Sequence, residues 1–281
     1  MKQIFCLVLS LCLCLSALPF LSAAKADSGD TLSLLAINIR KGDALLLRSG
    51  KSVYLIDTGK KGQYDLLSAT LAAEGISRLT GVIITHTDGD HVGGLKQLAN
   101  SGIKIENVYA SRWFVDEGKK HPVEKALKGT GLKAQYLSAG DSLPLDGGKL
   151  SVLGPVKADP EKENNNSLVL LAEGGGGSML LTGDMEFPEE ASLLDKGLIP
   201  HADVLKVANH GEDDATSAAL LLAVTPRLAV ISTNTEDEPD TPSSRVLRLL
   251  SAHNIPVLVT QDARRGILIT LRNGQINTEI R

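Results

Sequence analysis

The chain has 281 residues, and its 29 lysines and arginines against 33 aspartates and glutamates give a formal net charge of −4. Without residues 1–26, which hold Lys2 and Lys25 but no acidic residue, 27 basic residues face 33 acidic ones and the charge becomes −6. This acidic balance gives no general support for nucleic-acid binding, which depends on cationic surface, although a local basic groove remains open. The roughly 255 residues that remain can bury one large core.

Residues 1–26 have the plan of a secretory signal peptide. Lys2 precedes an apolar stretch at residues 4–21, and Ala24-Lys25-Ala26 supplies a small-x-small cleavage site. A retained membrane anchor is the alternative, because the apolar stretch approaches the length that spans a bilayer. We expect a bacterial protein that is secreted or held in the cell envelope, cleaved near Ala26, with a single domain at residues 27–281.

Apolar runs separated by turn residues predict strands first and alternating helices and strands afterwards, twice along the chain. In the first half we expect strands at residues 32–39, 44–47 and 53–56, a helix at 66–73, a strand at 82–84, a helix around Leu95 and Leu98, a strand at 108–110, and a loop with a helix at 112–131. In the second half we expect strands at 150–153, 168–172 and 179–182, a helix at 189–194, a strand at 204–208, a helix at 217–224, a strand at 228–231, a helix at 244–252, a strand at 257–259, and a closing hairpin from 267–271 through Asn273-Gly274. The four glycines at 174–177 predict a hairpin turn and not a phosphate loop, because no helix with a lysine follows. This order predicts an α/β (α+β) fold of two mixed sheets packed face to face with helices outside.

The densest group of candidate metal ligands, His86-x-Asp88-x-Asp90-His91, follows the strand expected at residues 82–84. Imidazole and carboxylate ligands together suit zinc, manganese or iron, and the intervening glycine lets the loop fold sharply. All three cysteines lie within residues 1–26, so nitrogen and oxygen alone would hold a metal ion. A polar loop that happens to carry two histidines is the alternative, but clustered ligand types are typical of a metal site.

Three other predicted strands also run into residues able to do chemistry. Asp57 follows the strand at 53–56, Asp184 follows the strand at 179–182, and His210 follows the strand at 204–208. Strand ends at one edge of a sheet are where α/β folds assemble their sites, so we expect these side chains to converge.

Together these motifs resemble the metallo-β-lactamase superfamily over essentially the whole chain after residue 26. The resemblance rests on Asp57-Thr-Gly, His86-x-Asp-x-Asp-His91-x-Gly-Gly, Leu181-Thr-Gly-Asp184 and His210-Gly, in this order. Three further stretches are similar to the hydrolase domain of the ComEC competence proteins: Gly42-Asp43-Ala44, Asn165-Asn166-Ser167-Leu168-Val169-Leu170 and Asp203-Val-Leu-Lys-Val. The resemblance implies a four-layer αββα sandwich with one or two divalent metal ions, Zn²⁺ or Mn²⁺, at its edge.

The resemblance also implies the roles of the ligands: His86 and Asp88 for one ion, Asp90, His91 and His210 for the other, and Asp184 as a bridge between them. Asp90 and Asp184 are the expected catalytic residues, because Asp90 would also orient the attacking water.

Members of the superfamily usually carry a histidine where this chain has Asp88, and another one before the strand near Ser167. That second position here reads Glu163-Asn164-Asn165-Asn166, without a histidine. We therefore expect the first metal position to bind more weakly, with manganese as a rival to zinc.

Four further residues are expected to support the ligands or to contact substrate: Asp57, Asn166, Lys206 and Asn209. Asp57 would steer a histidine or, alternatively, cap a turn. Lys206 is a candidate phosphate contact, with a solvated strand residue as the alternative. Arg40-Lys41, where the ComEC-like proteins usually have Gly-Gln, is a further candidate for phosphate contact, and a position at the surface is the favoured alternative.

These inferences predict an exported, metal-dependent hydrolase that acts on phosphodiester bonds, including those of DNA. Hydrolysis of a small ester, lactone or phosphocholine diester is a second interpretation, and a non-catalytic binding module for a metal or ligand is a third. Carboxylates at Glu212-Asp213-Asp214 would repel a polyanion unless they are compensated. The sequence indicates no obligate protein partner.

Overall fold

The computed structural model describes residues 31–115 and 118–281, so the predicted signal peptide lies outside the described residues. Eight strands in this part of the chain form the first sheet, and their spatial order is β17 (Gln275–Ile280), β16 (Gly266–Arg272), β1 (Thr31–Ile37), β2 (Leu45–Ser49), β3 (Ser52–Ile56), β5 (Gly81–Ile84), β7 (Val108–Ser111) and β8 (Ala134–Leu137). Neighbours from β17 to β3 are antiparallel, and those from β3 to β8 are parallel.

The second sheet has the same mixed plan. Over the same described ranges it holds seven strands in the order β15 (Val257–Val259), β14 (Leu228–Ile231), β13 (Val204–Lys206), β12 (Gly177–Leu181), β11 (Val169–Gly174), β10 (Gly148–Gly154) and β9 (Ser142–Leu145). Strands β15 to β12 are parallel, and β12 to β9 are antiparallel. A small parallel pair, β4 (Arg78–Leu79) and β6 (Lys104–Ile105), stands apart.

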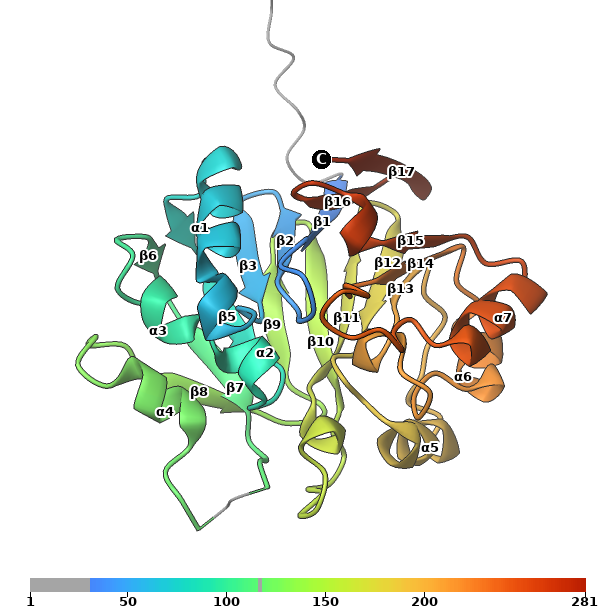
Figure 1. Cartoon of the computed structure of the whole chain (residues 1–281), viewed down its shortest axis with the longest axis horizontal. Coiled ribbons are helices and arrows are strands. Elements are labelled where there is room, and N and C mark those ends of the chain that lie inside the picture. The colour runs from blue at the N-terminus through green and yellow to red at the C-terminus, as the bar shows by residue number, and fades with distance from the viewer. Residues whose placement is uncertain (1–30, 116–117) are drawn as a thin grey trace, which may run out of the picture.

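Helices cover the outer face of each sheet, so the molecule has four layers (Figure 1). The helices beside the first sheet are α1 (Tyr64–Ala73), α2 (Gly89–Val92), α3 (Leu95–Leu98) and α4 (Pro122–Leu127); those beside the second are α5 (Phe187–Asp195), α6 (Ala218–Val224) and α7 (Ser244–Ala252). The predicted α/β sandwich of two mixed sheets is therefore confirmed. No helix within the described ranges combines the length and apolar content that crossing a bilayer requires.

Strand alternation builds three layers of core from the two sheets. In β1, Leu32 and Leu34 face the second sheet, whereas Leu35 and Ile37 face the helices. Both faces of the strand are buried because successive side chains point to opposite sides of a sheet. Each fully buried leucine contributes about 1.5–3 kcal/mol relative to an exposed one, which fixes the register of the strands that carry the site.

The Gly174–Gly177 turn was predicted correctly, since these residues pair as the last rung of the β11–β12 hairpin. Gly175 and Gly176 have φ of +62° and +77°, which a two-residue hairpin turn requires. Strands β8 and β9 were not predicted. Each lies at an edge of its sheet, and β9 contains Pro144, which a sequence pattern counts against a strand although edges tolerate it.

Candidate metal centre

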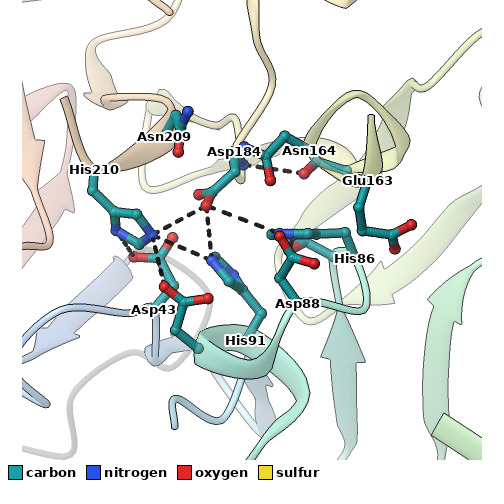
Figure 2. Close-up of polar contacts among 12 residues, drawn as sticks. Asp43, His86, Asp88, His91, Glu163, Asn164, Asp184, Asn209 and His210 are labelled. Atoms are coloured by element: carbon teal, nitrogen blue, oxygen red, sulfur yellow. Dashed lines mark hydrogen bonds and ion pairs between the residues drawn. The ribbon is translucent and has the colours of Figure 1, made fainter. Parts of the chain in front are cut away.

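Polar side chains from three strand ends meet at one edge of the sandwich. His86, Asp88, Asp90 and His91 follow β5, Asp184 follows β12 and His210 follows β13. Parallel pairing sets β12 beside β13, and Asn209 N donates to Gly183 O at 3.2 Å, which ties the two following loops together. Figure 2 shows the three imidazoles directed at the carboxylate of Asp184.

The three histidines are oriented alike, because each Nδ1 atom already has an oxygen partner. The contacts are His86 with Thr85 Oγ1 at 3.1 Å, His91 with Asp57 Oδ2 at 2.8 Å, and His210 with Ser232 O at 2.8 Å. A hydrogen bond at one ring nitrogen sets the tautomer and leaves the other nitrogen available as a ligand. Three Nε2 atoms are thus presented to the same space.

The free nitrogens converge on one oxygen. Asp184 Oδ2 lies 3.0 Å from His91 Nε2, 3.1 Å from His210 Nε2 and 3.9 Å from His86 Nε2. All three imidazoles are completely buried, and among the described residues neither His86 Nε2 nor Asp184 Oδ1 has a hydrogen-bond partner. Buried polar atoms without partners are costly, and a divalent cation would satisfy both. The donor set therefore fits a metal ion held by nitrogen and oxygen.

Two overlapping groups of the predicted ligand atoms share His91, and a third group joins His91 to Asp43 and Asp57. One contains His86, His91 and Asp184, and the other contains Asp90, His91 and His210. Asp90 Oδ2 is 3.6 Å from His210 Nε2, and the Asp90 side chain is 14% exposed. Asp88 Oδ2 is 3.7 Å from His86 Nε2, but its side chain is 48% exposed. Asp88 therefore lies at the rim of the site.

The charges of the centre raise the pKa of His91 and His210 and lower the pKa of Asp184. Burial by itself lowers the pKa of His91, but the charges of Asp184 and Asp57 outweigh it and raise that pKa well above its usual value. Burial raises the pKa of Asp184, yet His210 and His91 hold it well below its usual range. A metal ion would take the place of a proton on these histidines, so metal binding releases protons.

Asp57 and His210 have strained backbones that aim their side chains. Asp57 has φ of +60°, and its Oδ1 and Oδ2 also accept from Thr85 N at 2.8 Å and Thr85 Oγ1 at 2.7 Å. Asn209 and His210 have φ of +45° and +53° in succession. Such left-handed conformations cost about 1–3 kcal/mol per residue and are typical of functional sites. The contact that was expected of Asp57, with a histidine, is present.

Lys206 is placed differently from either sequence interpretation. It is completely buried, with Nζ 3.0 Å from Asp43 Oδ2 and donating to Val207 O at 3.0 Å. A buried, paired ammonium is neither a solvated strand residue nor positioned to meet a phosphate. Its partner Asp43, which is 1% exposed and lies 4.0 Å from His210 Nδ1, was missed as a site residue. The Gly42-Asp43-Ala44 motif could have identified Asp43 as a site residue from the sequence.

The two asparagines predicted near the site support loops. Asn166 Oδ1 accepts from Asp159 N at 2.9 Å, and its Nδ2 donates to Asp159 O at 2.8 Å. Asn209 Nδ2 donates to Asp214 Oδ1 at 3.0 Å, which holds one of the acidic residues after His210 in place. Neither amide contacts a candidate ligand in the contacts of the described residues, so Asn166 and Asn209 position the loops that flank the centre.

Glu163, in the stretch where the superfamily usually has a histidine, does not reach the centre. Its Oε1 accepts from Thr87 N at 2.8 Å and Thr87 Oγ1 at 2.6 Å, and its Oε2 accepts from Val115 N at 2.8 Å. Figure 2 shows its carboxylate directed away from Asp184. This residue joins two loops, and the His86 side of the centre gains no ligand from it.

Lys41, for which a surface position was favoured over a phosphate contact, lies against the centre. Its Nζ is 3.5 Å from Asp90 Oδ2, 3.5 Å from Glu212 Oε1 and 3.9 Å from Glu238 Oε2, and the side chain is only 16% exposed. Burial lowers the pKa of Lys41, but the charges of Asp90, Glu212 and other carboxylates outweigh it and the pKa is raised. The preceding Arg40 does point outward, and pairs with Asp237 at 2.7 Å.

Comparison with known families identifies the sequence pattern. Residues 38–235 match the sequence profile of the metallo-beta-lactamase superfamily. The chain is 32% identical over 253 residues to ComE operon protein 3 of Bacillus subtilis, which covers 88% of this chain and 32% of that protein. It is 29% identical over 244 residues to competence protein ComA of Neisseria gonorrhoeae, covering 85% of this chain and 32% of the relative. The chain thus spans about a third of the length of these relatives.

Solved structures share the fold at low sequence identity. The metallo-beta-lactamase fold protein YhfI from Bacillus subtilis superposes with a TM-score of 0.57 at 15% identity, over 86% of this chain and 99% of that one. A diphosphatase from the PhnP family superposes with a TM-score of 0.52 at 13% identity, over 85% of this chain and 97% of that one.

Proposed function

Because this chain belongs to the metallo-β-lactamase superfamily, we propose that it is a metal-dependent hydrolase of phosphodiester bonds. The single observation that carries the proposal is the set of three buried imidazoles whose Nε2 atoms face Asp184 Oδ2 within 3.0–3.9 Å. Within this set, His86 Nε2 and Asp184 Oδ1 are buried without hydrogen-bond partners among the described residues, which favours a metal ion between them.

His91, His210, Asp90 and Asp184 would hold one Zn²⁺ or Mn²⁺ ion, and His86 and Asp88 would hold a second one against Asp184. When bound, such an ion lowers the pKa of water and polarises the oxygen of the bond under attack. The exposure of Asp88 and the outward direction of Glu163 support weaker binding on the His86 side. One ion bound at the His91 side is therefore the expected state at limiting metal.

The residues of the chain have separate tasks in the proposed reaction. Asp90, which is partly exposed beside His210, orients the attacking water and accepts its proton. Asp57 holds the His91 ring through Nδ1 so that Nε2 keeps its direction. The ion pair between Lys206 and Asp43 lies next to His210 and holds this part of the site in place.

Exposed lysines around α4 support a polyanionic substrate such as single-stranded nucleic acid. This α4 lysine patch comprises Lys120, Lys125, Lys128 and Lys133, which are all exposed. A hollow of about 160 Å³ is lined by Lys120 and Lys125 and also by Asp88 at the rim of the centre. An adjoining hollow of about 410 Å³ continues along Lys120, Lys128 and Lys133. The linings also include Asp88, Glu163 and Glu124, but lysines outnumber these carboxylates and support a locally cationic surface beside the site.

Hydrolysis of a small ester, lactone or phosphocholine diester is the second enzymatic function consistent with the same centre. A binding module without turnover is the non-enzymatic alternative, and the ligand-poor His86 side is the observation that favours it. Export is also part of the proposal, and it rests on the signal-peptide pattern of residues 1–26.

One experiment separates these functions. The purified protein is analysed for bound metal and then assayed with single-stranded DNA, double-stranded DNA, bis-p-nitrophenyl phosphate and p-nitrophenyl acetate, with and without added Mn²⁺ or Zn²⁺. We expect metal-stimulated cleavage of DNA and of the small diester. Cleavage confined to small substrates would favour the second function, and bound metal without any turnover would favour the binding module.

A further inference from the structure

The loop that carries Lys41 is built to hold it beside the metal centre. Gly42 has φ of +135°, and a Cβ atom there would lie 2.7 Å from Asp90 O, so only glycine fits. Asp43 N donates to Asp90 O at 3.2 Å, and Gly59 N donates to Asp43 O at 2.9 Å. These contacts fix the loop between β1 and β2 against the turn that carries Asp90.

A second set of contacts fixes the outer side of the same loop. Arg40 Nε lies 3.0 Å and 2.9 Å from the two carboxylate oxygens of Asp237, and Arg40 Nη2 lies 3.1 Å from Glu236 Oε2. A bidentate arginine–carboxylate pair has a defined geometry. Arg40 thus serves as an anchor to the loop after β14, and its neighbour Lys41 faces inward.

The Lys41 ammonium is shared among carboxylates and is not locked to one. Its distances of 3.5 Å to Asp90, 3.5 Å to Glu212 and 3.9 Å to Glu238 all exceed the 2.7–2.9 Å that is typical of a charge-assisted hydrogen bond. Three carboxylates keep the ammonium charged and in place, while its donors remain available. The other lysine near the centre, Lys206, is committed to Asp43.

From these contacts we infer that Lys41 binds an anionic oxygen of the substrate while Asp90 and its neighbours act on the adjacent bond. The inference rests on the proposed phosphodiester function and names the residue that selects for negative charge. Without substrate, the Lys41 ammonium lies near Glu212 and Glu238. An anionic oxygen of the substrate competes with these carboxylates for the ammonium. The same ammonium also offsets the repulsion that these carboxylates would exert on a phosphodiester.

The test compares an anionic with a neutral substrate in the full-length, metal-loaded protein. Lys41→Gln should lower kcat/KM for bis-p-nitrophenyl phosphate by about 10- to 100-fold, mainly through KM, because a hydrogen bond to a charged group is lost. Hydrolysis of the neutral p-nitrophenyl acetate should stay within about twofold, and Lys41→Arg should recover part of the diester activity. Lys149→Gln, an exposed lysine on β10, is the matched control and should change neither substrate.

A binding measurement tests the inference without turnover. Inorganic phosphate should raise the Tm of the metal-loaded protein, and the shift should be lost in Lys41→Gln and kept in Lys149→Gln. An equal phosphate shift in Lys41→Gln, no shift in the unchanged protein, or equal loss of both ester and diester hydrolysis would overturn the role of Lys41. Absence of all hydrolysis with a Lys41-dependent phosphate shift would instead reject the proposed function and retain the anion contact.

Discussion

The Nδ1 atom of His91 lies 2.8 Å from Oδ2 of Asp57, and both side chains are completely buried. Asp57 reaches this position because its backbone turns into the left-handed region at φ of +60° directly after β3. The opposite ring nitrogen of His91 then faces Asp184 at 3.0 Å. A residue that contacts no candidate substrate thus sets the direction of the ligand shared by both halves of the centre.

Asp57→Asn should reduce metal affinity and activity by about 10- to 100-fold, which is typical when the carboxylate partner of a metal-binding histidine is changed. Asparagine has the same size and can still accept from Thr85 N, so the fold should be kept. The measurement is a metal titration with competing chelator, followed by diester hydrolysis at saturating metal. Full affinity in this variant would show that Asp57 acts only as a turn residue.

Removal of metal should lower the stability of the unchanged protein. In Asp184→Asn, the stability with metal and without metal should be nearly equal. A ligand that binds only the folded state at 100 times its Kd adds about 2.7 kcal/mol, so saturating Mn²⁺ or Zn²⁺ should raise the Tm of the unchanged protein clearly. Asp184→Asn loses the carboxylate on which three imidazoles converge, and its Tm should respond little. Calorimetry with metal and with chelator gives both values.

The exposed substitution Glu161→Gln serves as the control for that experiment and should keep the full metal shift. An equal shift in Asp184→Asn would mean that the ion binds elsewhere.

The candidate ligands were accessible from sequence because four of them are local. His86, Asp88, Asp90 and His91 occupy one loop, so their spacing alone indicated a metal site, and strand ends supplied the remainder. The two mixed sheets followed from strand periodicity and are confirmed. The edge strands β8 and β9 were not predicted, because their apolar alternation is short and is interrupted by polar residues and proline.

The two lysines could not be placed from sequence because their surroundings come from distant segments. Lys206 can be buried because Asp43, from the loop between β1 and β2 of the other sheet, supplies a charge at 3.0 Å. Lys41 faces the centre because its loop is fixed against the Asp90 turn and because Glu212 and Glu238 lie near its ammonium. A lysine in isolation is most often exposed, and tertiary pairing reverses that expectation without leaving a local pattern.

Stability should fall between pH 5 and pH 8 in part because of Glu189. Burial raises the pKa of this carboxyl from 4.5 to about 7, so the folded protein retains a proton that the unfolded chain has released. The stabilisation is fully present below pH 4.5 and is lost as the pH rises through 7. Glu189→Gln can still accept from Val156 N. The free energy of unfolding of this variant, relative to that of the unchanged protein, should therefore increase by about 2 kcal/mol from pH 5 to pH 8.

Urea unfolding at the two pH values, with metal held constant, measures this difference. Glu161→Gln, on an exposed carboxyl, should show no such dependence on pH. A parallel loss of stability in the unchanged protein and in Glu189→Gln would assign the pH dependence to other groups.

The α4 lysine patch should determine how strongly salt weakens binding of single-stranded DNA. Each lysine that neutralises a phosphate contributes about 0.7 to the slope of log affinity against log salt concentration for a single strand. The double variant Lys125→Gln/Lys128→Gln should therefore reduce that slope by about 1.4 and should weaken binding at low salt. Fluorescence anisotropy over a salt series, with Lys149→Gln as the control, gives the slopes, and an unchanged slope in the double variant would show that the strand does not follow α4.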